Sequence, residues 1–279
     1  MRESLTLDPA ARAARAARAA AVPASRRLAA AEHVVRFDTH QRLQHVLMMS
    51  SFIVLALTGF PQKFAELGIS QSFVNTLGGL ETVRAIHRGA GFVMLSNCAY
   101  HLTYLFTRIV AQKRYSAFAM VPQPRDALQA LQMVRYFLGL TKEKPAFDRF
   151  SYLEKFDYWA VFWGIAMMGG SGLVLMFAVQ VAHVAPGEIV PLAHTIHSDE
   201  AMLAVSWIAI VHMFNAHLAP GIFPFNPAIF TGKLRKDRYE HEHPVEYARL
   251  MAAQPQQAKA AAKAGPRQGG AAERDSEGG

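Results

Sequence analysis

Four long stretches of this chain carry no Lys, Arg, Asp or Glu, and they constrain its fold more than any other feature. They lie at residues 45–62, 89–107, 158–187 and 201–230. An uncharged, mostly apolar stretch of about 18 residues or more can cross the hydrocarbon core of a bilayer as a helix. Only 18% of the 279 residues are charged, against about a quarter in an average soluble domain. The sequence therefore predicts an integral membrane protein and excludes a soluble globular domain.

Four membrane-spanning helices are predicted from these stretches and the residues that bound them. Their expected ranges are 42–64, 83–109, 157–181 and 195–218. Between the second and third spans, the segment RDALQALQMVRYFLGL has the apolar spacing of an amphipathic helix at a membrane surface. The predicted fold is all-α, an antiparallel four-helix membrane bundle.

The segments on either side of the bundle differ from it in composition. Residues 1–34 are rich in Ala and Arg, and residues 249–279 are of low complexity. Both are predicted to be disordered tails, because such segments cannot bury enough apolar surface to fold. The predicted membrane domain between them is therefore expected to cover residues 35–248.

Basic residues are distributed unevenly along the chain. Of the 29 Lys and Arg residues, eight precede the first uncharged stretch, nine lie between the second and third spans and nine follow the fourth. Three lie between the first two spans, and the connection between the third and fourth has none. Cytoplasmic loops carry the excess of Lys and Arg, so both termini are predicted to be cytoplasmic in a bacterial inner membrane. The excess of Lys and Arg in cytoplasmic segments explains the net charge of +8, so no nucleic-acid partner is expected.

Six of the twelve histidines lie in or at the ends of the predicted spans, where ionisable groups are costly and mark functional sites. They are His45, His87, His101, His197, His212 and His217. His87 and His101 are fourteen residues apart, and His197 and His212 fifteen apart, so each pair returns to nearly one helix face after a rise of about 21–22 Å. Two helices that each offer two imidazoles suit two stacked bis-histidine haems b. Depth pairs His87 with His197 and His101 with His212. The single cysteine, Cys98, leaves no motif for covalent c-type haem.

The sequence around these histidines resembles the cytochrome b (gamma) subunit family of respiratory formate dehydrogenase. The motifs that carry the resemblance are QRLQHVLMMSSFIVLALTG, VRAIHRGAGFVML, FSYLEKFDYW, the Gly of SGLVLM, and IHSDEAMLAVSWIAIVHMF. The resemblance covers about residues 36–247 and is closest to the branch found beside multihaem cytochromes c. It implies that His45, His87, His197 and His212 ligate the irons of two haems b.

The partner of His212 stays open between two positions. The resemblance implies His45, whereas helix face and depth favour His101, which has no equivalent in the formate dehydrogenase pattern. His217 lies about 140° round the helix from His212 and at the depth of His45, so a third haem between His45 and His217 is an alternative. Another alternative is that the spare histidines line a quinone pocket or bond a haem propionate.

The resemblance also implies a quinone, menaquinone in particular, near the inner haem. Its pocket would include the residues just before the third span. The candidates there for binding the quinone oxygen or relaying its protons are Ser151, Glu154, Lys155 and Asp157. The alternative is that this cluster of charges and aromatic residues anchors a helix end at the membrane edge.

Together these features predict an electron-transfer subunit of a respiratory quinone oxidoreductase, with no dehydrogenase catalytic site of its own. It would pass electrons between the quinone pool and a periplasmic partner, a multihaem cytochrome c or an iron–sulfur subunit. The alternatives are a b subunit of hydrogenase or thiosulfate-reductase type, a transporter that uses intramembrane histidines, and a structural membrane anchor. The sequence lacks the inverted repeat and the intramembrane carboxylate typical of transporters.

Overall fold

The structure is a computed structural model that describes residues 33–113 and 115–263. The chain divides into two compact units, which are described separately: residues 35–233, and the chain ends, residues 1–34 with 234–279. The single domain expected over residues 35–248 stays a prediction. Residues 234–248 belong to the other unit, in which their helices pack on each other.

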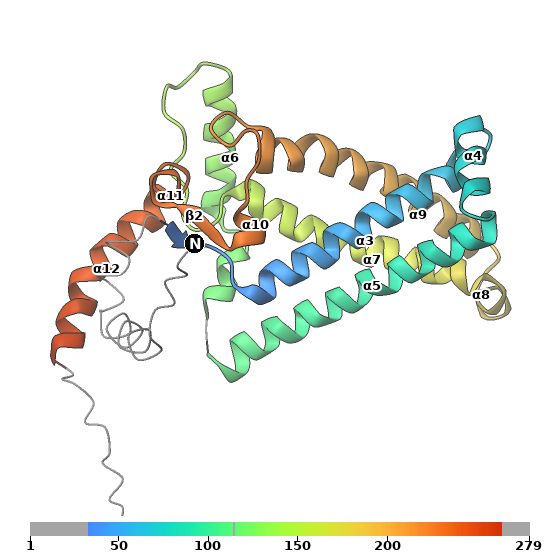
Figure 1. The fold of residues 1–279 in the computed structure, drawn as a ribbon, viewed down its shortest axis with the longest axis horizontal. Coiled ribbons are helices and arrows are strands. Elements are labelled where there is room, and N and C mark those ends of the chain that lie inside the picture. Colours follow the sequence, from blue (N-terminus) through green and yellow to red (C-terminus); the bar gives the residue numbers. More distant parts are fainter. Residues whose placement is uncertain (1–32, 114, 264–279) are drawn as a thin grey trace, which may run out of the picture. The chain divides into compact units, whose positions relative to one another are not determined.

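Four long helices form the larger unit, and they run side by side (Figure 1). They are α3 (Thr39–Lys63), α5 (Leu80–Phe106), α7 (Tyr152–Met176) and α9 (Ile189–Trp207). The most extensive packing is within two pairs, α3 with α5 and α7 with α9, and α5 also contacts α7. The short helix α4 (Gly68–Thr76) connects the first pair and α8 (Ala178–Val184) connects the second. The expected all-helical bundle is present.

Side-chain caps set where two of these helices begin. Asp38 caps α3, accepting a hydrogen bond from the Gln41 backbone N–H, while the Gln41 side chain accepts one from the Asp38 N–H. Ser151 and Glu154 form the same reciprocal cap on α7. This cap starts α7 five residues before the predicted third span. The helix then ends at Met176, because Phe177 leaves helical geometry, so the predicted range of 157–181 is shifted.

Two of the long helices continue as π-helical turns. Residues Thr107–Ala111 extend α5, and residues Ile208–His212 and Phe214–Leu218 extend α9. A π-helical turn contains more residues than an α-helical turn and changes the direction of the side chains that follow it. The predicted fourth span, 195–218, thus ends where the π-helical turns end, but its helix begins earlier, at Ile189.

Among the described residues, three helices are long and apolar enough to cross a membrane. They are Thr39–Lys63, Tyr152–Met176 and Ile189–Leu218. The predicted second span corresponds to α5, which is 27 residues long but is not one of the three. Polar side chains such as Asn97 and His101 lie along it. A helical membrane bundle is supported, whereas a fourth spanning helix at 83–109 stays a prediction.

The amphipathic helix expected between the second and third spans is also present. It is α6 (Pro124–Phe137), which follows a 3-10 helix, η2 (Tyr115–Met120), and packs against α7. Asp126 on α6 is buried, whereas Leu128 and Phe137 are 69% and 76% exposed. The polar side of α6 therefore contacts the bundle and its apolar side faces away from it.

The remaining elements are short, except for the last helix. After α10 (Ala228–Thr231), strand β2 (Lys233–Arg235) pairs with β1 (His33–Val35). In the smaller unit α11 (Lys236–Glu242) packs on α12 (Pro244–Lys263). The predicted disordered tail from residue 249 is therefore helical as far as Lys263, in agreement with its many Ala, Gln and Lys residues, which favour helix. Residues 1–32 and 264–279 of the predicted tails lie outside the described residues.

Candidate functional site

Each end of the bundle has ion pairs between segments far apart in the chain, and we name each end by one of their residues. At the Asp38 end, Asp38 pairs with Arg108 at 2.6 Å and Arg36 pairs with Glu154 at 3.0 Å. At the Lys63 end, Lys63 Nζ lies 3.1 Å from Asp199 Oδ1. The Asp38 end contains the starts of α3 and α7 and the turns after α5 and α9; the Lys63 end contains the opposite termini.

Opposing effects act on the Asp38 carboxyl group. Burial alone raises its pKa. Hydrogen bonds from the Gln41 N–H and the Tyr104 hydroxyl and the positive charge of Arg108 outweigh burial, and the pKa of Asp38 lies below its ordinary value. Asp38 is therefore a carboxylate at neutral pH, and it joins the start of α3 to the end of α5.

One pair of histidines lies at the Lys63 end. His87 of α5 and His197 of α9 lie opposite each other, with ring centres 6.2 Å apart and ring planes 70° from parallel. His87 Nδ1 lies 2.9 Å from Thr58 Oγ1. His197 Nδ1 lies 3.0 Å from Ser171 Oγ and 3.1 Å from the Met168 carbonyl oxygen. Helices α5 and α9 thus supply the two imidazoles, and α3 and α7 supply the groups that contact their Nδ1 atoms.

The contacts behind these rings determine which nitrogen carries the proton. A carbonyl oxygen can only accept, so Nδ1 of His197 is the donor to Met168. The Thr58 hydroxyl already donates to the Val54 carbonyl at 2.6 Å, so it accepts from His87 Nδ1. In both histidines Nε2 is then the nitrogen with a free lone pair. A neutral imidazole in this tautomer is ready to ligate a metal through Nε2.

A second pair lies at the Asp38 end. His45 of α3 and His212, in the π-helical turn after α9, have ring centres 6.4 Å apart and ring planes 30° from parallel. His212 Nδ1 donates to Asp157 Oδ2 of α7 at 3.1 Å, which leaves Nε2 as the ring nitrogen available to a metal. His45 Nδ1 is buried and has no hydrogen-bond partner within the part of the chain that the structure describes.

The separation of the rings indicates what each pair can bind. A metal–imidazole bond is about 2 Å long and the ring centre lies about 1 Å beyond the nitrogen, so two imidazoles on opposite sides of one metal have centres about 6 Å apart. Both pairs have this separation. In residues 33–113 and 115–263 no group of three or more His, Cys, Asp or Glu side chains could hold a metal ion. Two imidazoles at this separation are a donor set that haem iron takes.

Two glycines allow helices to approach the rings of the Lys63-end pair. A Cβ atom on Gly59 of α3 would lie 3.3 Å from His87 Cε1. A Cβ atom on Gly172 of α7 would lie 3.1 Å from His197 Cε1 and 3.5 Å from its Nδ1. The missing side chains thus leave room for the imidazoles at this end. Gly172 is the glycine of the SGLVLM motif, whereas no sequence motif had indicated the roles of Gly59, Thr58 or Ser171.

The structure brings His45, and not His101, to His212. Both nitrogens of His101 are hydrogen-bonded, Nδ1 to Gln44 Oε1 at 2.7 Å and Nε2 to the Tyr158 hydroxyl at 3.0 Å. His101 was expected opposite His212 because the two lie at the same depth. Instead, α5 packs against α3 and α7, and these helices supply Gln44 and Tyr158 as the partners of His101. The depth of a residue along a helix does not specify which neighbouring helix its side chain meets.

His217 also has its own partners. Its ring stacks on Phe225 with centres 4.5 Å apart, and its Nδ1 accepts a hydrogen bond from the Asn226 N–H at 3.2 Å. The sequence had offered His217 as a partner of His45 in a third haem site. The ring that lies opposite His45 at a metal-bridging distance is that of His212.

The four quinone candidates lie at the start of α7, where they contact α6 and other elements of the Asp38 end. Ser151 caps the helix, and Glu154 accepts hydrogen bonds from it and pairs with Arg36. Lys155 is buried, and its Nζ lies 2.9 and 2.8 Å from the two carboxylate oxygens of Asp126. Asp157 contacts His212 instead.

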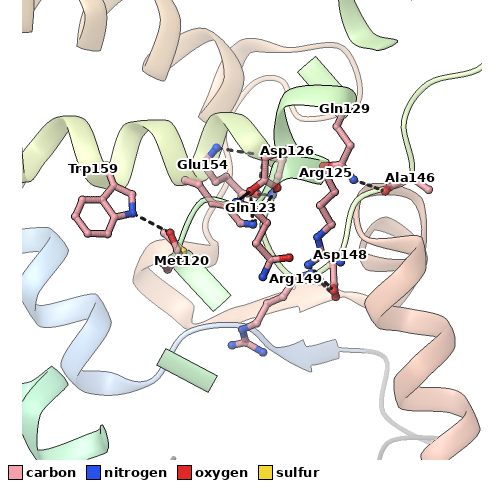
Figure 2. Close-up of polar contacts among 12 residues, drawn as sticks. Met120, Gln123, Arg125, Asp126, Gln129, Ala146, Asp148, Arg149, Glu154 and Trp159 are labelled. Atoms are coloured by element: carbon pink, nitrogen blue, oxygen red, sulfur yellow. Dashed lines mark hydrogen bonds and ion pairs between the residues drawn. The ribbon is translucent and has the colours of Figure 1, made fainter. Parts of the chain in front are cut away.

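Figure 2 shows polar contacts that α6 and the segments around it make at this point. The Trp159 indole N–H donates to the Met120 carbonyl at 2.9 Å, and Gln129 bonds the Ala146 carbonyl at 3.0 Å. Helix anchoring therefore accounts for several of these contacts. The charges and aromatic residues of this segment had left that interpretation open beside quinone binding.

Comparison with known families gives one finding that bears on these pairs. The family described as prokaryotic cytochrome b561 matches residues 36–222, about two thirds of the chain. The matched region contains all four facing histidines and the residues behind them. No curated protein matches the chain.

Proposed function

The chain belongs to the prokaryotic cytochrome b561 family, and from this premise we propose that it is a di-haem membrane subunit that transfers electrons between the quinone pool and a periplasmic redox partner. Proteins of this family are membrane cytochromes that bind haem b and take part in electron transfer. The proposal adds the number of haems, their ligands, the quinone and the partner. It also groups the chain with the gamma subunits of respiratory formate dehydrogenase, which its motifs resemble.

The observation that carries this proposal is the pair of facing imidazoles at each end of the bundle. Their ring-centre distances of 6.2 and 6.4 Å fit two axial ligands of one iron. We assign His87 and His197 to one haem b, and His45 and His212 to the other. His101 and His217, whose ring nitrogens contact protein groups, are not ligands in this assignment.

Haem b supplies reversible one-electron iron chemistry when bound. The side chains of this chain hold and orient the ligands: Thr58, Ser171 and Asp157 lie against Nδ1 of three of the four histidines. Two haem levels about 20 Å apart, by the helical rise between His197 and His212, would together cover much of the roughly 30 Å hydrocarbon core. This separation suits a subunit that moves electrons across a bilayer.

We place the quinone at the Asp38 end, beside the first turns of α7. Ser151, Glu154, Lys155 and Asp157 are the candidate residues. The Glu154 side chain is 40% exposed, whereas that of Lys155 is 3% exposed and is held by Asp126. We therefore assign Glu154 to accept a proton from a quinol, and Lys155 to hold α6 on α7.

The orientation in the membrane follows from the distribution of basic residues. Both termini and the Asp38 end are proposed to be cytoplasmic, and the Lys63 end periplasmic. A multihaem cytochrome c or an iron–sulfur subunit would dock at the Lys63 end. Substrate specificity would then lie in that partner, because the proposal gives this chain no dehydrogenase catalytic site.

The test is the haem content of the purified chain, from a reduced-minus-oxidised spectrum and a pyridine haemochrome count. We expect two haems b per chain, and one in each of the variants His45→Ala, His87→Ala, His197→Ala and His212→Ala. The matched control is His101→Ala, which should keep two. A colourless chain made with ample haem would refute the proposal and favour a transporter or a structural anchor. Three haems per chain would refute the di-haem assignment.

A further inference from the structure

The two imidazole pairs differ in what lies behind them. At the Lys63 end, the Nδ1 atoms contact neutral groups: the hydroxyls of Thr58 and Ser171 and the carbonyl of Met168. At the Asp38 end, Nδ1 of His212 contacts a carboxylate oxygen of Asp157. Of the groups behind the four rings, the carboxylate alone carries a formal negative charge.

Two hydrogen bonds fix the Asp157 carboxylate in place. Its Oδ2 accepts from His212 Nδ1 at 3.1 Å, and its Oδ1 accepts from the Trp207 indole N–H at 2.7 Å. The Trp207 ring in turn lies against Phe156, with ring centres 4.8 Å apart. The carboxylate is thus directed at the imidazole by an indole that is itself packed.

The charged neighbours of Asp157 on α7 have other partners. Lys155 contacts both carboxylate oxygens of Asp126, and Glu154 is paired with Arg36. In the described part of the chain, no Lys or Arg forms an ion pair with Asp157. Its negative charge therefore acts on His212 without a neutralising contact.

A carboxylate that accepts a hydrogen bond from the Nδ1–H group makes the imidazole a stronger electron donor through Nε2. A more basic axial ligand stabilises the oxidised iron relative to the reduced iron, and the negative charge acts in the same direction. We propose that Asp157 is a positioning residue that lowers the reduction potential of the haem held by His45 and His212 below that of the haem held by His87 and His197. This inference rests on the proposed function.

The difference in potential gives the electron path a direction. Electrons would pass one at a time from the haem held by His45 and His212 to the haem held by His87 and His197. The donor at the Asp38 end would be a quinol, whose two electrons leave in two such transfers and whose two protons are released as it becomes a quinone. An oxidised redox partner at the Lys63 end would accept both electrons. The carboxylate thereby favours electron flow from the Asp38 end to the Lys63 end.

Potentiometric titration of the purified di-haem chain tests this inference. The midpoint that is lost in His212→Ala identifies the Asp38-end haem, and in the wild type it should be the lower of the two. Asp157→Asn keeps the side-chain shape but removes the charge. It should raise that midpoint by at least a tenfold change in the equilibrium, about 59 mV for one electron, and leave the other midpoint unchanged. Asp157→Glu should keep the midpoint near the wild-type value.

Trp207→Phe should shift the midpoint of the Asp38-end haem in the opposite direction. It keeps an aromatic ring against Phe156 but removes the N–H that shares the charge of Asp157. The carboxylate should then interact more strongly with His212, and the Asp38-end midpoint should fall. Trp207→Phe also tests the effect of Asp157 on the reduction potential if Asp157→Asn binds no haem at the Asp38 end.

Three results would overturn the inference. They are an unchanged Asp38-end midpoint in Asp157→Asn with full haem content, equal shifts of both midpoints, and a Trp207→Phe midpoint that does not fall. Each of these leaves two haems per chain, so the proposed function would stand. A wild-type chain without haem would instead refute the proposed function itself.

Discussion

Replacing Gly172 by Ala tests whether the Lys63-end imidazoles are held where the structure has them. The added Cβ atom would lie 3.1 Å from His197 Cε1, about 0.3 Å closer than the 3.4 Å at which ordinary contact begins. The ring cannot move away freely, because its Nδ1 is held by Ser171 and Met168 at 3.0 and 3.1 Å. Overpacking of this kind costs about 1–3 kcal/mol, against a gain of about 1 kcal/mol from replacing Gly in a helix.

Haem content is the decisive assay for this variant. Disturbing a residue that positions a metal ligand weakens metal binding by about tenfold to a hundredfold, so Gly172→Ala should lose haem from the Lys63 end and keep the other. The matched control is Gly170→Ala on the same helix, whose Cβ would have no neighbour within 4 Å. It should bind both haems. Full haem content in Gly172→Ala, with unchanged midpoints and a raised thermal stability, would refute the placement of His197.

Three further predictions concern groups on either side of this site. Lys155→Ala should cost about 3–5 kcal/mol of stability, measured by thermal unfolding in detergent, because it leaves the Asp126 carboxylate buried and unpaired. The pKa of Asp38 is lowered from 3.8, so its carboxylate should stabilise the folded chain above about pH 4, and this should be lost as the pH falls through the lowered value. The difference in unfolding free energy between Asp38→Asn and the wild type, followed from about pH 6 to about pH 3, measures this contribution. Thr58→Val should weaken haem binding by His87 about tenfold or more, as followed by haem titration, whereas Thr58→Ser should retain it.

The outcomes that contradict these predictions are equally specific. Arg125→Ala removes a more exposed ion pair, that with Asp148, and should lower the unfolding free energy by less than about 1 kcal/mol. If Lys155→Ala lowers the unfolding free energy by no more than this, the buried pair of Lys155 and Asp126 does not stabilise the fold. A stability difference for Asp38→Asn that persists unchanged at low pH would exclude the acid linkage. Equal haem affinities for Thr58→Val and Thr58→Ser would mean that the hydroxyl does not hold the His87 ring.

Sequence patterning was informative where a local rule applies. The charge-free stretches predicted the long helices, because a helix in a bilayer must be apolar over its length. The amphipathic spacing of RDALQALQMVRYFLGL predicted α6, which is present. The family match confirms a membrane b-type cytochrome, which the histidines in apolar stretches had indicated.

Helix ends and exact spans were less well predicted. The Ser151–Glu154 cap begins α7 before the apolar stretch does, because hydrogen bonds to the first backbone N–H groups, and not hydropathy, set where a helix begins. The helix through Lys263 was missed because low-complexity sequence was interpreted as disorder, although Ala, Gln and Lys favour helix.

The sequence by itself determined that this chain is a helical membrane protein with histidines in its apolar segments, because hydropathy and helical period are properties of consecutive residues. The tertiary structure decided which histidines face each other. It brought His45 rather than His101 to His212, through the packing of α5 against α3 and α7 and the π-helical turns after α9. It also decided that Asp157 lies behind His212. These residues are far apart in the chain, and no local pattern specifies which helix faces pack together.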